Sequence, residues 1–400
     1  MQRTRMPRLP LVMALTLFVT TTAQADFQSC VTDLREQAQQ EGISDSMTEQ
    51  VFAGMEPLER VIELDRRQPE FTASFANYLG RRVTSERVEQ GRELLEEHRE
   101  LLESITRETG VPPHYLLAFW GMETNFGSYF GRMPIPDALT TLACDERRSD
   151  YFTGELMNAL KILDRGDIEP ERMKGSWAGA MGHMQFMPSV YLRHAVDADG
   201  SGRVDLWESI PDAMTSAGNF LEDLGWNRGE RWGREVLLPE GFDYHVAQGR
   251  NEKRTLSEWR DMGLTDAFGN PLPDLDMEAA LLLPSGHEGP AFVVYDNFHV
   301  IMGWNRSEFY ALAVGHLADR IAGGGELQRT PPDHEPLSLD TVEQMQKQLN
   351  ERGFDAGPED GVLGPSTRSG LRAFQQSEGL RADGYPDPDS LERLGLERSN

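Results

Sequence analysis

Apolar residues recur at helical spacing along most of the chain before residue 236. Between residues 26 and 109 the sequence is polar, and its apolar positions follow the three-to-four-residue spacing of surface helices. Pro112 and Pro113 then open a segment, residues 114–122, that is apolar on nearly every side, as in a helix buried in the middle of a domain. The pattern therefore predicts a buried central helix with more polar helices before it.

A different pattern occupies residues 236–304, where short apolar runs are interrupted by glycine and proline. The runs at 235–238, 279–283 and 291–295 have the length and composition of strands. Helical spacing returns at residues 307–321. The sequence thus predicts an α+β domain that is mainly α-helical and carries a small β insertion.

A Gly/Pro-rich stretch, residues 323–336, separates this domain from a small C-terminal one and has the composition of a flexible linker. Beyond it, residues 339–352 and 366–378 show the spacing of two amphipathic helices. A segment of about sixty residues is small for a self-sufficient core. We therefore expect domains at residues 26–322 and 337–400, joined by the linker.

The first 25 residues have the pattern of a secretory signal peptide. Three arginines precede an apolar run from residue 9 to 19, and Ala23-Gln24-Ala25 fits the small-residue rule for cleavage. The run is short for a bilayer, and we expect no membrane span elsewhere. Because Cys30 lies five residues beyond Ala25, a lipid anchor is not expected either. The sequence predicts a soluble, exported protein of the periplasm.

Composition and charge narrow the class of partner. Four hundred residues with 38% hydrophobic content suffice for two or more domains. The formal net charge of −27 makes nucleic acid an implausible partner. An acidic surface favours solubility but indicates no particular chemistry.

The chain has two cysteines, Cys30 and Cys144. In an oxidising, exported compartment a single pair is more typical of one disulfide than of a metal site. The alternative is that both are buried free thiols.

Glu123 is the first candidate for catalysis. It is a lone carboxylate between the apolar helix and a glycine-containing turn, in the stretch from Trp120 to Gly127. Burial favours the protonated form of a carboxyl group, and a protonated glutamate can act as general acid toward a glycosidic oxygen. The alternative is a glutamate that caps or pairs locally at a helix end.

A second segment, residues 175–189, reads Gly-Ser-Trp-Ala-Gly-Ala-Met-Gly-His-Met-Gln-Phe-Met-Pro-Ser. Together with the turn around Glu123 it resembles the membrane-bound lytic transglycosylase B family. The resemblance extends from about residue 27 to 321, including residues 196–207 and 304–313. It implies a lysozyme-like catalytic domain.

The resemblance also implies roles for individual residues. Glu123 would be both catalytic acid and catalytic base. Residues that would line or shape the sugar cleft are Ser176, Gln185, Phe186, Met187, Trp304 and Asn305. The alternatives are that the polar ones satisfy buried backbone groups and that the apolar ones belong to the core.

Two positions differ from the usual family pattern. His183 stands where glutamine is usual, and Trp304 stands where tyrosine is usual. Trp304 can still stack on a sugar face or pack in the core. We expect a changed hydrogen bond to substrate at these positions, and no effect on the acid itself.

Residues 197–208 fit the pattern of an EF-hand loop, in which oxygen donors at fixed positions bind calcium. The candidate ligands are Asp197, Asp199, Ser201, Arg203 and, as the closing carboxylate, Glu208. The family resemblance implies a closing carboxylate a few residues later, which makes Asp212 the alternative to Glu208. A single loop suggests a structural calcium ion. The other interpretation is a polar turn before a helix, with Asp212 as an early helical acid.

The C-terminal segment resembles the peptidoglycan-binding domain type 1, a three-helix module. The matching stretches are residues 342–349, 353–354, 360–367, 371–375, 379–380 and 383–384. The alternative is a helical interaction module of another purpose.

The family resemblance implies a monomeric enzyme that needs no cofactor for catalysis. It would cleave the β-1,4 bond between N-acetylmuramic acid and N-acetylglucosamine in peptidoglycan and leave 1,6-anhydromuramic ends. One rival is a lysozyme-type hydrolase, which needs a second carboxylate such as Asp137, Asp145 or Glu146. The other is a non-catalytic wall-binding protein in which Glu123 is structural.

Overall fold

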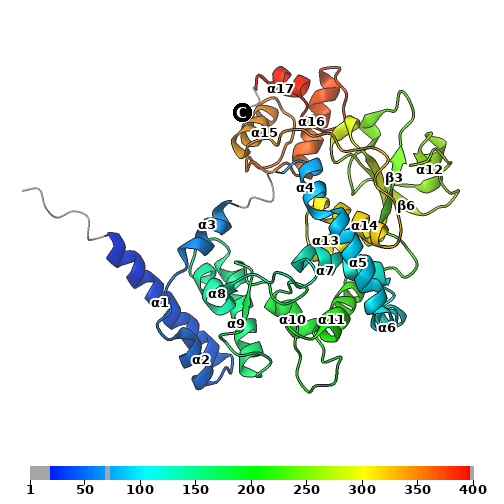
Figure 1. Ribbon diagram of the computed structural model, residues 1–400. Coiled ribbons are helices and arrows are strands. Elements are labelled where there is room, and N and C mark those ends of the chain that lie inside the picture. Colours follow the sequence, from blue (N-terminus) through cyan, green and yellow to red (C-terminus); the bar gives the residue numbers. More distant parts are fainter. Residues whose placement is uncertain (1–18, 68–72, 397–400) are drawn as a thin grey trace, which may run out of the picture. The chain divides into compact units, whose positions relative to one another are not determined.

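Helices dominate both units into which the chain divides (Figure 1). This computed structural model describes residues 19–67 and 73–396. The first unit comprises residues 1–66, 131–181 and 186–192, and the second comprises residues 67–130, 182–185 and 193–400. Most of the expected signal peptide, residues 1–18, lies outside the described part.

The first unit is a group of helices with one small sheet. Its elements are α1 (Val19–Gln40), α2 (Asp45–Phe52), α3 (Glu59–Arg67), α8 (Ile135–Ala143), α9 (Ser149–Asp164), most of α10 (Pro188–His194), and the antiparallel pair β1 (Met133–Pro134) and β2 (Lys174–Gly175). Helix α9 buries Phe152, Leu156 and Leu160, which share one face because they are four residues apart. This face packs against α8.

A disulfide joins the two cysteines within the first unit, as expected from the sequence. Cys30 lies on α1 and Cys144 caps the C-terminus of α8, with their Cα atoms 5.9 Å apart. The bond closes a loop with a sequence separation of 114 residues. It attaches the first described helix to the helical pair α8 and α9.

The second unit is built around α7 (Pro113–Thr124), the buried helix expected from the sequence. Its residues 115–122 are all buried, which explains why the segment has no polar face. Helix α7 packs against α5 (Ser85–Glu97), α6 (Arg99–Thr109), α11 (Ile210–Asp223) and α14 (Glu308–Ile321). Helices α4 (Phe75–Arg82) and α13 (Asp296–Trp304) pack on α14.

The β insertion forms a five-stranded antiparallel sheet in the order β4-β6-β7-β3-β5. The strands are β3 (Gly233–Leu237), β4 (Lys253–Thr255), β5 (Thr265–Asp266), β6 (Glu278–Leu282) and β7 (Ala291–Val294). The short helix α12 (Leu256–Asp261) places Trp259 in the core with Leu281 and Val293. We call residues 233–295 the sheet subdomain.

The sheet subdomain ends earlier than the sequence pattern suggested. Residues 296–304 form helix α13, not a continuation of the strand region. Phe298, Ile301 and Met302 are buried at three- and four-residue spacing, which suits a helix. The apolar run of β7 immediately before α13 concealed this change in period.

The C-terminal module, residues 337–396, contains three helices: α15 (Leu339–Glu351), α16 (Pro365–Ser377) and α17 (Pro388–Leu394). Its apolar core is small and includes Met345, Leu349 and Phe374. Two buried glutamines supplement it. Gln346 bonds Asp360, Gly361, Val362 and Thr367, and Gln375 similarly bonds Gly384, Tyr385 and Ser390, so each fixes one Asp-Gly loop.

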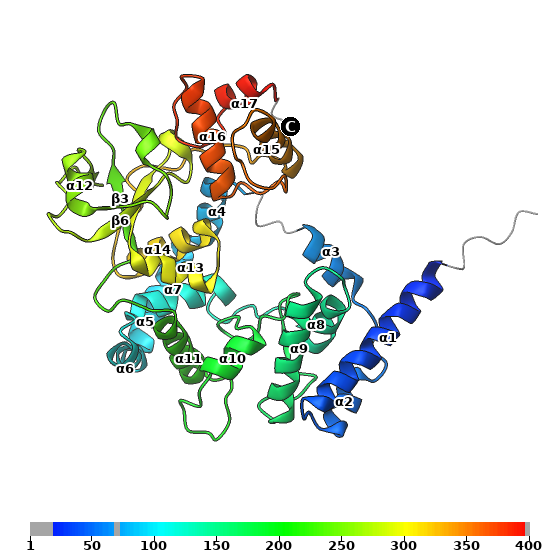
Figure 2. The same ribbon diagram turned by 180° about the vertical axis from the view of Figure 1, so that it is seen from behind.

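The segment between α14 and α15 has neither helix nor strand, as expected of residues 323–336. It nevertheless bonds the sheet subdomain, because the backbone N–H groups of Gln328 and Arg329 donate to Glu235 at 2.8 Å each. Both views show α16 beside the sheet (Figures 1 and 2). Within the described residues, no helix combines the length and apolarity needed to cross a membrane.

We predict that the disulfide contributes about 3 to 5 kcal/mol to the stability of the first unit, because it closes a long loop in the unfolded chain. The Cys30→Ser/Cys144→Ser double variant should therefore unfold at a lower temperature than the oxidised chain, and reduced wild type should match the variant. Intact mass with and without reductant measures the bond directly. Full alkylation of both thiols without reduction would contradict it.

Candidate active site

Glu123 lies in the last turn of α7, at the point where the helix ends. Asn125 and Phe126 follow with positive φ angles of 49° and 57°, so the chain reverses sharply after the acid. Gln185 also has a positive φ, and Arg148 is the only other such non-glycine residue in the described part of the chain. Left-handed conformations of ordinary residues cost energy and often mark functional sites.

Two side chains donate hydrogen bonds to the same oxygen of Glu123. The Trp304 indole N–H, at the end of α13, donates to Oε1 at 3.1 Å. The Tyr310 hydroxyl, in the first turn of α14, also donates to Oε1. An ionised carboxylate oxygen has two lone pairs in its plane. Both on Oε1 are therefore engaged, and a transferable proton has to be carried by Oε2.

Tyr310 is a neutral donor throughout the ordinary pH range. Its side chain is buried, and this burial, followed by the negative charge of Glu123, raises the pKa of the phenol well above its usual value. Tyr310 lies within the family resemblance, which implied no role for it. Its position three residues after the helix-capping Ser307 was the available signal, because that spacing fixes the first turn of α14.

Trp304 is held by aromatic contacts on the second unit. Its ring centroid lies 4.5 Å from that of Phe119 on α7 and 5.1 Å from that of Phe220 on α11. The expectation that the substitution of tyrosine by tryptophan leaves the acid untouched is therefore wrong, since the indole N–H bonds Glu123. The larger ring reaches the carboxylate while its body stays packed.

Asn305 and Ser307 shape the turn between the two donors. Asn305 is the C-terminal cap of α13, and its side-chain Oδ1 accepts from the Ser307 N–H at 3.1 Å. Ser307 Oγ in turn accepts from the Tyr310 N–H. Asn305, which was expected to line the sugar cleft, and Ser307 thus fix the backbone between Trp304 and Tyr310.

His183 and Gln185 lie near the end of α7 in the same unit. His183 Nδ1 accepts a hydrogen bond from the Trp120 indole at 2.9 Å, and its carbonyl accepts from Thr124 Oγ1 at 2.8 Å. Gln185 donates to the carbonyls of Phe130 and Gly182. Gly127 makes room for His183, because an added Cβ would lie 2.5 Å from the imidazole ring. These contacts support the turn that carries Glu123.

The other expected cleft residues belong to the first unit. Ser176 Oγ accepts from the N–H groups of Ala178 and Ala180, which holds a tight glycine-rich turn. Phe186 is buried and bridges to Met181, and Met187 is half-buried. The described contacts of Ser176 therefore match the alternative in which its hydroxyl satisfies backbone groups.

The candidate second carboxylates of a hydrolase also lie in the first unit. Asp145 forms an ion pair with Arg66 and accepts from the Arg147 N–H. Glu146 is exposed, and Asp137 lies in the first turn of α8, where burial raises the pKa of its carboxyl group. The described hydrogen bonds to Glu123 Oε1 come from none of these three residues. They come from the neutral side chains of Trp304 and Tyr310.

The expected calcium loop gathers three carboxylates in the second unit. Oxygens of Asp197, Asp199 and Asp212 lie within 4.8 Å of one another. Asp212 is buried and accepts from the N–H groups of Ala198 and Asp205, so it organises the loop. Oxygen ligands of calcium lie 2.3–2.6 Å from the ion, so such a group fits around one ion.

The remaining expected ligands are placed differently. Glu208 is exposed and does not belong to the three-carboxylate group, so the geometry favours Asp212 as the closing carboxylate. Ser201 Oγ donates to the Arg203 carbonyl. Hydrogen bonds, the one from Ser209 foremost, lower the pKa of Asp199 and keep it ionised. An anionic oxygen set of this kind suits a hard cation.

The model of the transglycosylase SLT domain family matches residues 26–319. The chain belongs to this family. The peptidoglycan binding domain model matches residues 338–394. Membrane-bound lytic murein transglycosylase B of Escherichia coli (strain K12) is 32% identical over 250 residues, which cover 62% of this chain and 68% of that protein. The chain is thus a lytic transglycosylase, an enzyme class that acts on peptidoglycan.

Solved lytic transglycosylases share the fold. SltB3 from Pseudomonas aeruginosa, in complexes with NAG-anhNAM-pentapeptide and with NAG-NAM-pentapeptide, is 43% identical with a TM-score of 0.88. The match covers 92% of this chain and 99% of SltB3. Escherichia coli Slt35 in complex with calcium is 30% identical with a TM-score of 0.62, over 75% of this chain and 93% of Slt35.

The burial of His183 should make the free energy of unfolding of this lytic transglycosylase depend on pH. Burial lowers the pKa of His183 from its usual 6.5 to about 4, although Asp205 opposes the shift. Between these values the unfolded chain binds a proton that the folded chain does not. Protonation of the unfolded chain at His183 therefore does not reduce the free energy of unfolding above about pH 6.5, and reduces it progressively as the pH falls toward 4.

The free energy of unfolding of the wild type should fall between pH 7 and pH 5 by about 2 kcal/mol more than that of His183→Gln, because glutamine does not bind a proton. Glutamine retains an acceptor for Trp120. Denaturant unfolding of both proteins at the two pH values measures the difference. Equal losses would show that His183 does not carry this pH dependence.

Proposed function

We propose that this lytic transglycosylase cleaves the β-1,4 bond between N-acetylmuramic acid and N-acetylglucosamine in peptidoglycan and forms 1,6-anhydromuramic ends. The observation that carries the proposal is the setting of Glu123, a single carboxylate with one oxygen held by two neutral donors. The NAG-anhNAM-pentapeptide complex of SltB3 supports the choice of product chemistry.

In the first step, protonated Glu123 Oε2 donates its proton to the glycosidic oxygen while the bond from that oxygen to C1 breaks. The carboxylate that remains keeps its hydrogen bonds from Trp304 and Tyr310 to Oε1. These bonds stabilise its negative charge and fix its plane. Glu123 is then positioned as a base on the same side of the sugar.

In the second step, Glu123 Oε2 accepts the proton of the muramic C6 hydroxyl as that oxygen bonds to C1. The reaction consumes no water, and the glutamate ends in its protonated starting form. A hydrolase with two carboxylates would need a second acidic side chain to activate water. Here the nucleophile is supplied by the substrate, so one protein carboxylate performs both proton transfers.

We assign the remaining functional parts as follows. Residues 26–322 form the catalytic domain, residues 323–336 join it to the wall-binding module at 337–400, and the signal peptide directs the enzyme to the periplasm. Gln185 and Asn305, which belong to the same unit as Glu123, line the glycan cleft. Calcium stabilises the loop before α11 and is held by Asp197, Asp199 and Asp212. The calcium complex of Slt35 supports this inference.

Product analysis tests the reaction. Purified peptidoglycan digested in heavy-oxygen water should yield ends that contain no heavy oxygen and are lighter by one water molecule than hydrolysed ends. A lysozyme run in parallel should incorporate the label. Labelled reducing ends from this enzyme would overturn the proposal in favour of a hydrolase.

Calcium should raise the melting temperature of chelator-treated enzyme, because a ligand that binds only the folded state stabilises it by mass action. The Asp199→Asn variant removes one charge from the exposed edge of the group and should abolish most of this increase. Magnesium, which prefers a smaller octahedral site, serves as the control ion. Identical melting with and without calcium would remove the ion from the account.

A further inference from the structure

A large groove lies between the sheet subdomain and the C-terminal module, apart from the residues around Glu123. Its volume is about 940 Å³. One wall is formed by residues 241–245, which include the start of the 3-10 turn at Tyr244–Val246, together with Ser285, His287 and Glu288. The other wall is formed by residues 376–389 of the module, and His334 of the connecting segment closes one side. Its size is typical of a site for a small organic ligand.

The groove is fixed by contacts between its two walls. Asp383, which is 2% exposed, accepts hydrogen bonds from both the backbone N–H and the Nδ1 of His287, each at 2.8 Å. His334 bonds the Tyr385 hydroxyl at 3.0 Å and Glu288 at 3.1 Å. The module is therefore held against the sheet subdomain, and the groove exists because of this docking.

The aromatic rings of the groove are already covered. The Arg381 guanidinium lies over the Tyr244 ring at 5.8 Å from its centroid, and the His334 ring packs on Tyr385 with a centroid separation of 5.4 Å. Phe242 is buried in the sheet subdomain core. Stacking on a sugar face is thus disfavoured, and charged groups are the main recognition elements that remain.

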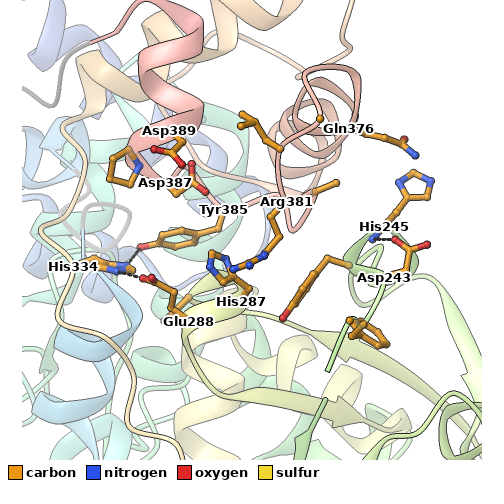
Figure 3. Close-up of a pocket in the computed structure, with 18 residues that line it drawn as sticks. Asp243, His245, His287, Glu288, His334, Gln376, Arg381, Tyr385, Asp387 and Asp389 are labelled. Atoms are coloured by element: carbon orange, nitrogen blue, oxygen red, sulfur yellow. Dashed lines mark hydrogen bonds and ion pairs between the residues drawn. The ribbon is translucent and has the colours of Figure 1, made fainter. Parts of the chain in front are cut away.

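These charged groups have both signs. Figure 3 shows Arg381 between Asp387 on one side and Asp243 on the other. Asp387 and Asp243 each accept a backbone hydrogen bond, from Ser390 and His245. Among the described residues, none forms an ion pair with Arg381 or with Asp389. An exposed guanidinium and an exposed carboxylate on one wall suit a ligand that carries a carboxylate and an ammonium group.

We propose that this groove binds the peptide stem of peptidoglycan, with Arg381 taking a stem carboxylate and Asp389 taking the ammonium group of its diamino acid. This inference rests on the proposed function, because it assumes that the enzyme meets peptidoglycan. The groove then holds a peptide stem of peptidoglycan while Glu123 acts on a glycan strand. Both recognition groups lie on the module, and the docked sheet subdomain supplies the opposite wall that closes the groove around the ligand.

Calorimetric titration of the full chain with a free stem pentapeptide that contains diaminopimelate tests the proposal. Arg381→Ala and Asp389→Asn should each weaken binding about fivefold or more, because each loses a charge-assisted contact. Lys347→Ala removes an exposed charge from α15, outside the groove, and should bind as wild type does. Acetylation of the diaminopimelate amine should weaken wild-type binding and remove the difference between wild type and Asp389→Asn.

Absence of pentapeptide binding to the wild type, or equal affinity for all four proteins, would overturn the proposal. The proposal would also fail if Arg381→Ala weakened the binding of a peptide-free chitooligosaccharide and left pentapeptide binding unchanged. The groove would then recognise glycan. Thermal unfolding of each variant controls for folding. The same wild-type preparation is assayed for anhydro ends, so a failed reaction contradicts the proposed function and a failed titration contradicts the groove.

Discussion

The site depends on one arrangement, the convergence of Trp304 and Tyr310 on a single oxygen of Glu123. Glu123 is supplied by α7, Trp304 by α13 and Tyr310 by α14, so three helices must be correctly packed for the carboxylate to have this environment. A carboxylate that donates and then accepts a proton needs a fixed plane, and neutral donors provide it without adding charge.

The sequence predicted the elements that have strong local patterns. The buried helix expected at 114–122 is α7, and the three apolar runs of the β insertion overlap β3, β6 and β7. Helix α13 was missed because its apolar residues were assigned to the strand region before it, although Asp296 and Asn297 interrupt the apolar run after β7. In the module, α17 has seven residues, too few to show a helical period, and only the family resemblance implied a third helix.

The candidate site was predictable as residues but not as contacts. Glu123 was identified from its position after an apolar helix and from the family motifs, whereas its hydrogen bonds join residues 181 and 187 positions apart. Such separations have no local sequence signal. In the calcium loop the spacing rule offered Glu208 and the family resemblance offered Asp212, and the burial of Asp212 among backbone donors distinguishes them. Tertiary packing decided each of these points.

The central claim is that Glu123 alone performs both proton transfers, and the Glu123→Gln variant tests it most directly. Glutamine keeps the size of the side chain and an acceptor for Trp304 and Tyr310, but it cannot exchange a proton at neutral pH. The account predicts that this variant melts as wild type does, binds insoluble peptidoglycan and releases no anhydro ends. Anhydro ends released at a rate near that of the wild type would contradict it.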